Sequence, residues 1–143
     1  MGMVGKARIL VVDSQTAVAL MMVFLLTRAG CDAQAAFNIE SVLRLAQRQW
    51  FDLITLDVEM PGLNGFELFK HLKQISHLAA TPIVFVSRRA TIENQQYALD
   101  ELGAADFIEK PFDAQDFLSR IISCVRDNDN SGLVEAIPEN SMA

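Results

Sequence analysis

Cysteine is scarce in this chain of 143 residues, which contains only Cys31 and Cys124. Neither belongs to a Cys-x-x-Cys pair or to a cluster with histidine, so the sequence predicts no disulfide framework and no zinc site. We interpret both as buried thiols in a reducing compartment, and we therefore expect the protein in the cytoplasm.

Long apolar runs are also missing. The longest, residues 17–26, has ten residues, too few to cross a bilayer. Asp13 and Gln15 interrupt the apolar region before this run, which argues against a signal peptide. We therefore expect no membrane segment.

Positive charge is absent from the end of the chain. All twelve lysines and arginines precede residue 127, whereas residues 127–143 hold four acids and account for −4 of the net charge of −6. We interpret residues 1–126 as one domain and residues 127–143 as an acidic, flexible tail or a truncated linker. The domain itself is slightly acidic. It therefore lacks the basic stripe that direct binding to nucleic acid requires.

The chain has an alternation of short apolar runs and longer helical patterns. A hydrophobic share of 51% and a charged share of 21% are typical of a globular protein with a core. Five strand–helix units favour a doubly wound α/β fold: a flavodoxin-like, five-stranded parallel sheet in the order 2-1-3-4-5 with five helices. The predicted strands are residues 9–12, 32–37, 53–56, 83–86 and 106–109, and the predicted helices are 15–29, 39–49, 66–72, 91–103 and 114–126.

Details of the helices follow from the same patterns. The helix over 15–29 is apolar nearly all round, so we expect its neighbours to cover it well. Ser14 is a reasonable N-cap for this helix, and Asn38, Thr91 and Asp113 are suited to cap later ones.

Polar residues stand where four of the predicted apolar strands end: Asp13, Asp57, Ser87 and Lys110. Ligands of such sheets bind at the carboxyl ends of the strands, so these side chains should share one edge. Two carboxylates, a hydroxyl and an ammonium group there suit a phosphoryl group and a hard cation such as Mg²⁺. An aspartate at the centre can act as a nucleophile and form an acyl phosphate.

Four segments together resemble the receiver domain of a two-component response regulator, close to the single-domain chemotaxis type. Residues 9–13 resemble its first strand, residues 51–65 its phosphorylation segment, and residues 82–87 and 103–112 its remaining signatures. The resemblance covers about residues 7–126. Such a combination is far more specific than one short motif.

The resemblance implies a role for each matching residue. Asp57 would be the phosphoacceptor, and Lys110, which commonly precedes a cis proline in this family, would contact the phosphoryl group. Asp13, Asp57 and the backbone carbonyl of Glu59 would hold Mg²⁺. The protein would then be no enzyme in the usual sense, because it would catalyse only its own phosphotransfer and dephosphorylation.

The resemblance also implies a switch. Ser87 would move to the phosphoryl group and the ring of Phe107 would follow inward. The fourth helix, fifth strand and fifth helix would form the output surface. The partners would be a histidine kinase or histidine phosphotransfer protein and a downstream protein target or lost output domain. A homodimer through that surface is a further arrangement that the resemblance allows.

Three positions depart from the family pattern. Ser14 replaces the usual second acid, so Mg²⁺ should bind more weakly. Arg88 replaces a small residue beside the switch hydroxyl. It either points to solvent, or shields the pocket or supplies positive charge to the phosphoryl group. Arg89 could pair with Glu59, whose position tunes dephosphorylation in the family. We hypothesise slow phosphotransfer and a long-lived aspartyl phosphate.

Two other functions remain as alternatives. A degenerate, non-phosphorylated receiver could serve as a protein–protein scaffold with the same fold. Phosphatases of the haloacid dehalogenase type also use an aspartate at a strand end, but they need a second aspartate two residues later, where this chain has Glu59. Nucleotide binding is disfavoured because neither GxGxxG nor GxxxxGK[ST] follows a predicted strand.

Overall fold

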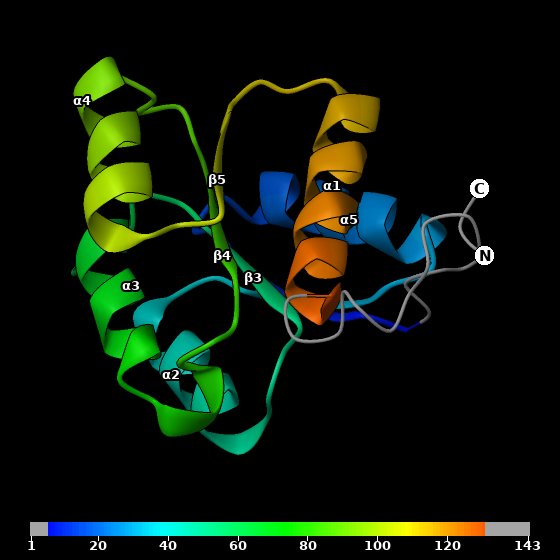
Figure 1. The fold of residues 1–143 in the computed structure, drawn as a ribbon, viewed down its shortest axis with the longest axis horizontal. Helices are drawn as coiled ribbons and strands as arrows, with labels where there is room; N and C mark the ends of the chain where they lie inside the picture. Colours follow the sequence, from blue (N-terminus) through cyan, green and yellow to red (C-terminus); the bar gives the residue numbers. More distant parts are fainter. Residues whose placement is uncertain (1–5, 131–143) are drawn as a thin grey trace.

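The strands form one parallel sheet in the order β2-β1-β3-β4-β5 (Figure 1). The computed structural model describes residues 6–130. This order confirms the predicted doubly wound, flavodoxin-like fold. The strands are β1 (Arg8–Val12), β2 (Asp32–Ala36), β3 (Leu53–Leu56), β4 (Ile83–Ser87) and β5 (Asp106–Glu109).

Helices cover both faces of the sheet, because successive residues of each buried strand point to opposite faces. In β1, Ile9 and Val11 face α1 and α5, whereas Leu10 and Val12 face α2, α3 and η2. Figure 1 shows these two layers on opposite sides of the sheet. The helices are α1 (Thr16–Arg28), α2 (Ile39–Arg48), α3 (Gly65–Lys73), η1 (Ser76–Leu78), α4 (Ile92–Gln96), η2 (Tyr97–Leu102) and α5 (Ala114–Asn130).

Three of the four predicted caps are confirmed. The side chains of Asn38, Thr91 and Asp113 each accept a hydrogen bond from the backbone N–H three residues later, at 2.8, 3.0 and 2.9 Å. The prediction for Ser14 is wrong. Gln15 is the residue that precedes α1, and its backbone N–H is held at 2.9 Å by the carboxylate of Asp13, which fixes where the helix begins.

The fourth and fifth helices differ from their predicted form. Residues 92–96 are α-helical, but Tyr97–Leu102 forms wider π-helical turns before Gly103 ends the helix at a φ of +82°. Helix α5 continues to Asn130 instead of ending near residue 126, so the exposed residues Asp127 and Asn128 still belong to it. The predicted tail therefore begins inside α5, and residues 131–143 lie outside the described part of the chain.

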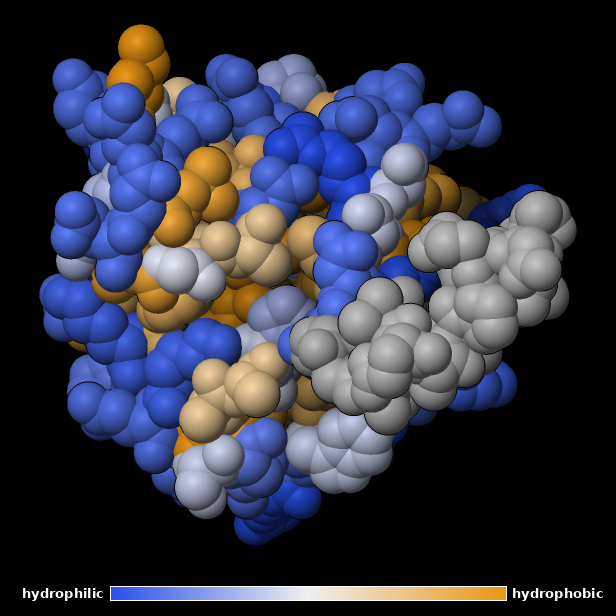
Figure 2. All heavy atoms as spheres, in the orientation of Figure 1, coloured by the Kyte–Doolittle hydropathy of each residue, from blue (hydrophilic) through white to orange (hydrophobic). Residues whose placement is uncertain are grey.

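The expectation that α1 is covered on all sides is wrong. Leu20, Met21 and Phe24 expose 51, 45 and 58% of their surface, because only one stripe of the helix contacts the sheet and α5. The surface over α3 and α4, at the left of Figure 2, is mostly hydrophilic with smaller hydrophobic areas. Within residues 6–130, no helix combines the length and the apolar character that crossing a membrane requires.

Candidate functional site

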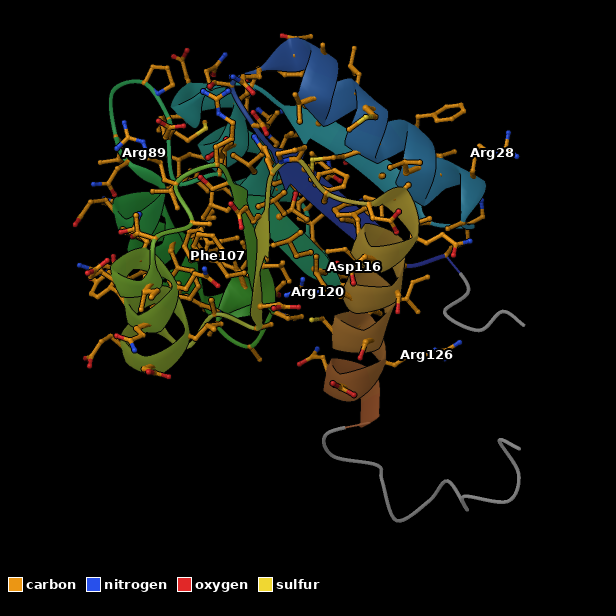
Figure 3. All side chains as sticks on the ribbon, turned by 90° about the horizontal axis from the view of Figure 1, so that it is seen from above. Arg28, Arg89, Phe107, Asp116, Arg120 and Arg126 are labelled. Atoms are coloured by element: carbon orange, nitrogen blue, oxygen red, sulfur yellow. The ribbon has the colours of Figure 1, made fainter. Side chains whose placement is uncertain are left out.

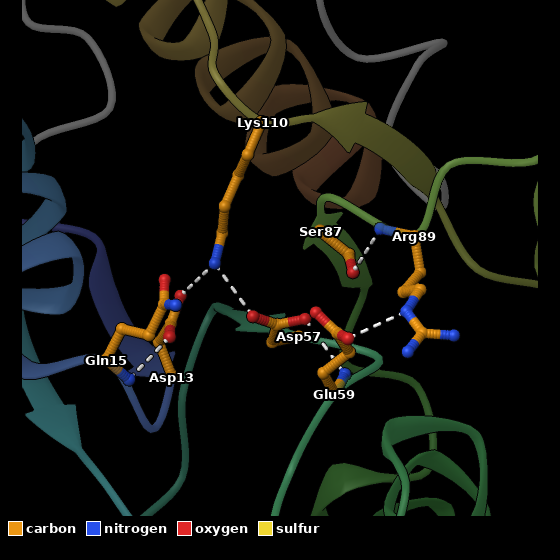
Figure 4. Close-up of polar contacts among 7 residues, drawn as sticks. All are labelled: Asp13, Gln15, Asp57, Glu59, Ser87, Arg89 and Lys110. Carbon is orange, nitrogen blue, oxygen red and sulfur yellow. Dashed lines mark hydrogen bonds and ion pairs between the residues drawn. The ribbon is translucent and has the colours of Figure 1, made fainter.

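The predicted strand-end residues meet at one edge of the sheet, where Lys110 joins two carboxylates (Figure 4). Its Nζ lies 2.6 Å from Oδ2 of Asp13, which follows β1, and 2.7 Å from Oδ2 of Asp57, which follows β3. The three side chains are at most 6% exposed. Parallel strands bring them together although Asp13 and Lys110 are 97 residues apart in the chain.

The second oxygen of each carboxylate is also bound. Oδ1 of Asp13 accepts the backbone N–H of Gln15, and Oδ1 of Asp57 accepts that of Glu59, both at 2.9 Å. These turns fix the orientation of both carboxylates before any ligand binds. Each Oδ2 atom therefore faces the interior of the site, toward Lys110.

The charge of Lys110 depends on these two carboxylates. Burial by itself lowers the pKa of an ammonium group, but the hydrogen bonds and negative charges of Asp13 and Asp57 outweigh burial and raise the pKa of Lys110. The lysine is therefore charged at neutral pH. The three groups together carry a formal charge of −1, so the site can accept a further cation.

The switch hydroxyl predicted at Ser87 is linked to Asp57 through Arg89 and Glu59. The backbone N–H of Arg89 donates to Oγ of Ser87 at 3.1 Å. The side-chain Nε of Arg89 lies 2.7 Å from Oε2 of Glu59, whose backbone N–H holds Asp57. Figure 4 shows this continuous chain of contacts. The predicted pairing of Arg89 with Glu59 is thus present.

A cavity of about 390 Å³ opens beside Asp57. Ser14 and Glu59 line it, and so does Arg88, whose side chain is exposed. Arg88 is thus exposed to solvent and also lines the cavity, and its effect on phosphotransfer stays a prediction. The cavity is large enough for a phosphoryl group, a cation and several waters.

The family model for the response regulator receiver domain matches residues 9–122. The chain belongs to this family. It is 34% identical over 119 residues to the phosphate regulon transcriptional regulatory protein PhoB of Escherichia coli, which covers 83% of the chain. It is 30% identical over 134 residues to the sensory transduction protein RegX3 of Mycolicibacterium smegmatis, which covers 92%. The chain spans only 52% and 57% of the length of these two relatives.

Solved receiver structures share the fold. A CheY-like receiver domain protein from Methanospirillum hungatei matches with a TM-score of 0.82 and 25% identity, covering 90% of this chain and 100% of that one. The chemotaxis response regulator CheY4 of Vibrio cholerae matches with a TM-score of 0.77 and 29% identity, covering 83% and 98%. Receiver domains are signalling domains of two-component systems.

Phe107, the aromatic residue of the predicted switch, already lies inside this receiver domain. Its ring is only 3% exposed and stacks on Phe85 with the ring centroids 5.9 Å apart. Phe85 also contacts Phe66 of α3, which packs edge-on against Tyr97 at 5.0 Å. The buried ring of Phe107 thus belongs to an aromatic cluster that extends through Phe85 and Phe66 to Tyr97, the first residue of η2.

Arg120 of α5 binds beside Phe107. Its guanidinium contacts both carboxylate oxygens of Asp106 at 2.7 and 2.9 Å and the carbonyl of Phe107 at 3.1 Å. A second guanidinium nitrogen of Arg120 lies 3.3 Å from Oδ2 of Asp116, one helical turn earlier. Figure 3 labels both residues on α5. Arg120 therefore ties α5 to β5, the strand that carries Phe107.

Receiver domains generally bind Mg²⁺ at the phosphorylation site. The oxygen donors here fit such an ion, since Asp13 and Asp57 place their carboxylates around one point, and Ser14 and Glu59 line the adjoining cavity. Among residues 6–130, however, no three histidine, cysteine or acidic side chains are arranged to hold a metal ion. A backbone carbonyl, a hydroxyl and waters would have to complete the ligand set.

Sequence reasoning located Asp13, Asp57, Ser87 and Lys110, and the structure brings them into one site. It did not find the contact of Ser87 with the backbone of Arg89, for which the sequence holds no signal. Gly65, the last residue of the predicted phosphorylation segment, also packs against the backbone of Asp57, and no sequence pattern indicates this contact.

Proposed function

We propose that Asp57 accepts a phosphoryl group from a phosphohistidine of a histidine kinase or phosphotransfer protein. The observation that carries this proposal is the position of Lys110 Nζ, within 2.7 Å of both Asp57 and Asp13 in a buried site. A carboxylate oxygen of Asp57 attacks phosphorus, the phosphorus–nitrogen bond of the donor breaks, and the imidazole recovers a neutral nitrogen. The product is an acyl phosphate.

The chain's own groups stabilise the transferred charge. A phosphoryl group adds up to two negative charges and three acceptor oxygens. Lys110 is close enough to bind one of these oxygens, and the hydroxyl of Ser87 can turn to another while Arg89 N–H still donates to it. Asp13, Asp57 and the backbone carbonyl of Glu59 would hold Mg²⁺, which neutralises negative charge during the transfer.

This chain offers the phosphodonor protein a docking surface beside Asp57. An apolar groove of about 490 Å³ runs from α1 to the start of α5. Gln15 and Arg88 line both this groove and the cavity beside Asp57, so a helix in the groove would bring its histidine next to Asp57. The groove is lined by Gln15, Val18, Met21, Arg88, Lys110, Pro111 and Phe112. Such a partner would meet the chain in the cytoplasm.

Ser14 and Arg88 make phosphotransfer to Asp57 slower than in a usual receiver domain. Ser14 offers a neutral hydroxyl where a carboxylate would bind Mg²⁺, so the ion is held more weakly. Arg88 at the mouth of the cavity obstructs small donors and water and adds positive charge near the phosphoryl group. Both effects favour slow transfer and a long-lived aspartyl phosphate. A normal lifetime that Arg88→Ala leaves unchanged would contradict this part.

Phosphorylation changes the conformation of the face made by α4, β5 and α5, and this change carries the signal to a partner. Arg120 links α5 to β5 next to Phe107, so a movement near Ser87 and Phe107 reaches this face through direct contacts. The face would bind a downstream protein, an attached output domain or a second copy of the chain.

The experiment is intact-protein mass spectrometry after incubation with acetyl phosphate and Mg²⁺. We expect a gain of about 80 Da, the mass of one phosphoryl group, which Asp57→Asn abolishes. No gain under a fast quench and high Mg²⁺ would favour the second candidate, a non-phosphorylated scaffold. The observation in favour of a scaffold is the group of exposed apolar residues on α1, which could bind another protein.

A further inference from the structure

Glu59 has a carboxylate at the rim of the site that the phosphoryl chemistry leaves unused. Its backbone N–H donates to Oδ1 of Asp57 at 2.9 Å, and Glu59 lines the same cavity as Asp57 and Ser14. Within residues 6–130, the carboxylate of Glu59 pairs with Nε of Arg89 alone, at 2.7 Å. The backbone of Glu59 is thus held by Asp57, while the position of its carboxylate is held by the ion pair with Arg89.

The contact between Glu59 and Arg89 is easy to exchange. Their side chains are 42 and 66% exposed, and ion pairs with such exposure contribute little to stability. In contrast, the carboxylates of Asp13 and Asp57 are at most 5% exposed and share the ammonium group of Lys110. Among these three carboxylates, only that of Glu59 can change partner at low cost.

The charge of the site favours such a change. Asp13, Asp57 and Lys110 sum to −1, and the neighbouring Ser14 adds a neutral hydroxyl. A divalent cation in the cavity is balanced better when a third carboxylate turns to it, and it attracts Glu59 more strongly than the single charge of Arg89 does.

We propose that the side chain of Glu59 is an exchangeable ligand for the divalent cation of this site. Glu59 pairs with Arg89 in the cation-free protein and turns to the cation, directly or through a bound water, when Mg²⁺ or Mn²⁺ occupies the cavity beside Asp57. The inference rests on the proposed function, since it concerns the cation of the same site. Arg89 is the competitor that sets the affinity.

This exchange would also couple cation binding to the loop after β4. Arg89 donates its backbone N–H to Ser87 Oγ at 3.1 Å, and its carbonyl accepts the side-chain amide of Asn94 at 2.9 Å. Release of its side chain removes the ion pair that ties this loop to Glu59. The loop that carries the switch hydroxyl then becomes freer to adjust to a phosphoryl group.

The test is a titration of the full 143-residue chain with Mn²⁺, in which electron paramagnetic resonance measures the free ion, followed by competition with Mg²⁺. We expect Glu59→Gln to weaken Mn²⁺ binding about tenfold. Arg89→Gln should strengthen it about threefold, the size of an exposed ion pair. In the Glu59→Gln background, Arg89→Gln should add nothing, because the competition no longer exists.

Arg88→Gln is the matched control for charge alone. Arg88 lines the cavity and carries the same charge as Arg89, but in the described part of the chain it forms no hydrogen bond or ion pair with Glu59. Equal effects of Arg88→Gln and Arg89→Gln, additive with Glu59→Gln, would overturn the proposal and leave only long-range electrostatics. So would unchanged binding in Glu59→Gln, or no binding of Mn²⁺ to the wild type.

A direct readout follows the carboxyl carbon of Glu59 in ¹³C-glutamate-labelled protein, assigned with Glu59→Gln. Bound Mn²⁺ should broaden this resonance strongly, and a sharp resonance at saturation would refute the ligand role. Neither measurement needs a phosphoryl group. Failure of phosphorylation, scored separately by intact mass with acetyl phosphate, is therefore distinguishable from failure of this inference.

Discussion

Gly65 packs so closely on Asp57 that a Cβ atom at Gly65 would lie 2.0 Å from the backbone oxygen of Asp57. The backbone N–H of Gly65 also donates to the carbonyl of Val58 at 2.7 Å, which closes the loop around the phosphoacceptor. The first turn of α3 thus sets the position of Asp57 by direct contact between backbones. Any side chain at Gly65 must push the strand end or the helix away.

Replacing Gly65 should therefore damage both folding and function. We expect Gly65→Ala to lower the free energy of unfolding by about 3 kcal/mol and to reduce phosphorylation of Asp57, because neither backbone can move away freely. Urea unfolding and intact mass with acetyl phosphate measure the two effects. Gly62→Ala is the control: nothing lies within 4 Å of an added Cβ, so only its φ of +88° costs about 1 kcal/mol.

Removal of the ammonium group of Lys110 should destabilise the fold, because two buried carboxylates then lack a counter-charge. We expect Lys110→Met to lower the free energy of unfolding by about 3 kcal/mol, because Asp13 and Asp57 lose their common cation. Adding Asp13→Asn should restore part of that loss. Denaturant melts of the single and double variants measure it, and equal stability of Lys110→Met and wild type would contradict the prediction.

Thr55 offers a gain in stability. Its hydroxyl is the buried side-chain group that has no hydrogen-bond partner among residues 6–130, in the middle of β3. Thr55→Val keeps the shape and removes the unpaired hydroxyl, so it should raise the free energy of unfolding by about 1 kcal/mol. Thr81→Val should do the opposite by a similar amount, because the hydroxyl of Thr81 donates to the carbonyl of Phe51 at 3.2 Å.

Cys124 should be an unreactive thiol. Burial, followed by the negative charges of Asp106 and Asp127, raises its pKa from 9.0 to about 11. The thiolate fraction at pH 8 is then about a hundredfold lower than that of an ordinary thiol. In a Cys31→Ala background, iodoacetamide should therefore modify Cys124 slowly in the folded protein and quickly in urea.

The same pKa shift predicts a loss of stability at alkaline pH. The folded protein keeps the proton of Cys124 to higher pH than the unfolded chain does, so the unfolded state binds fewer protons between pH 9 and about 11. The free energy of unfolding should fall over this range more steeply in the wild type than in Cys124→Ala. Parallel curves for the two proteins would show that the thiol contributes nothing.

Local patterns were enough to predict the elements of this receiver domain. Continuous apolar runs such as residues 9–12 are typical of strands buried on both faces, and Asn38, Thr91 and Asp113 cap helices through their own side chains. The boundary of α5 was missed because Asp127 and Asn128 favour a helix end locally, whereas the helical backbone continues to Asn130. The π-helical turns after Gln96 have no signature in the sequence either.

The sequence by itself determined the fold and the residue types at the strand ends, because buried strands and their termini follow from short-range patterns. Local patterns do not predict that α1 keeps an exposed apolar side. Nor do they determine that Lys110 contacts both Asp13 and Asp57, or that Arg89 pairs with Glu59. These contacts join residues far apart in the chain. Their existence depends on the register and packing of the whole sheet, which no local pattern encodes.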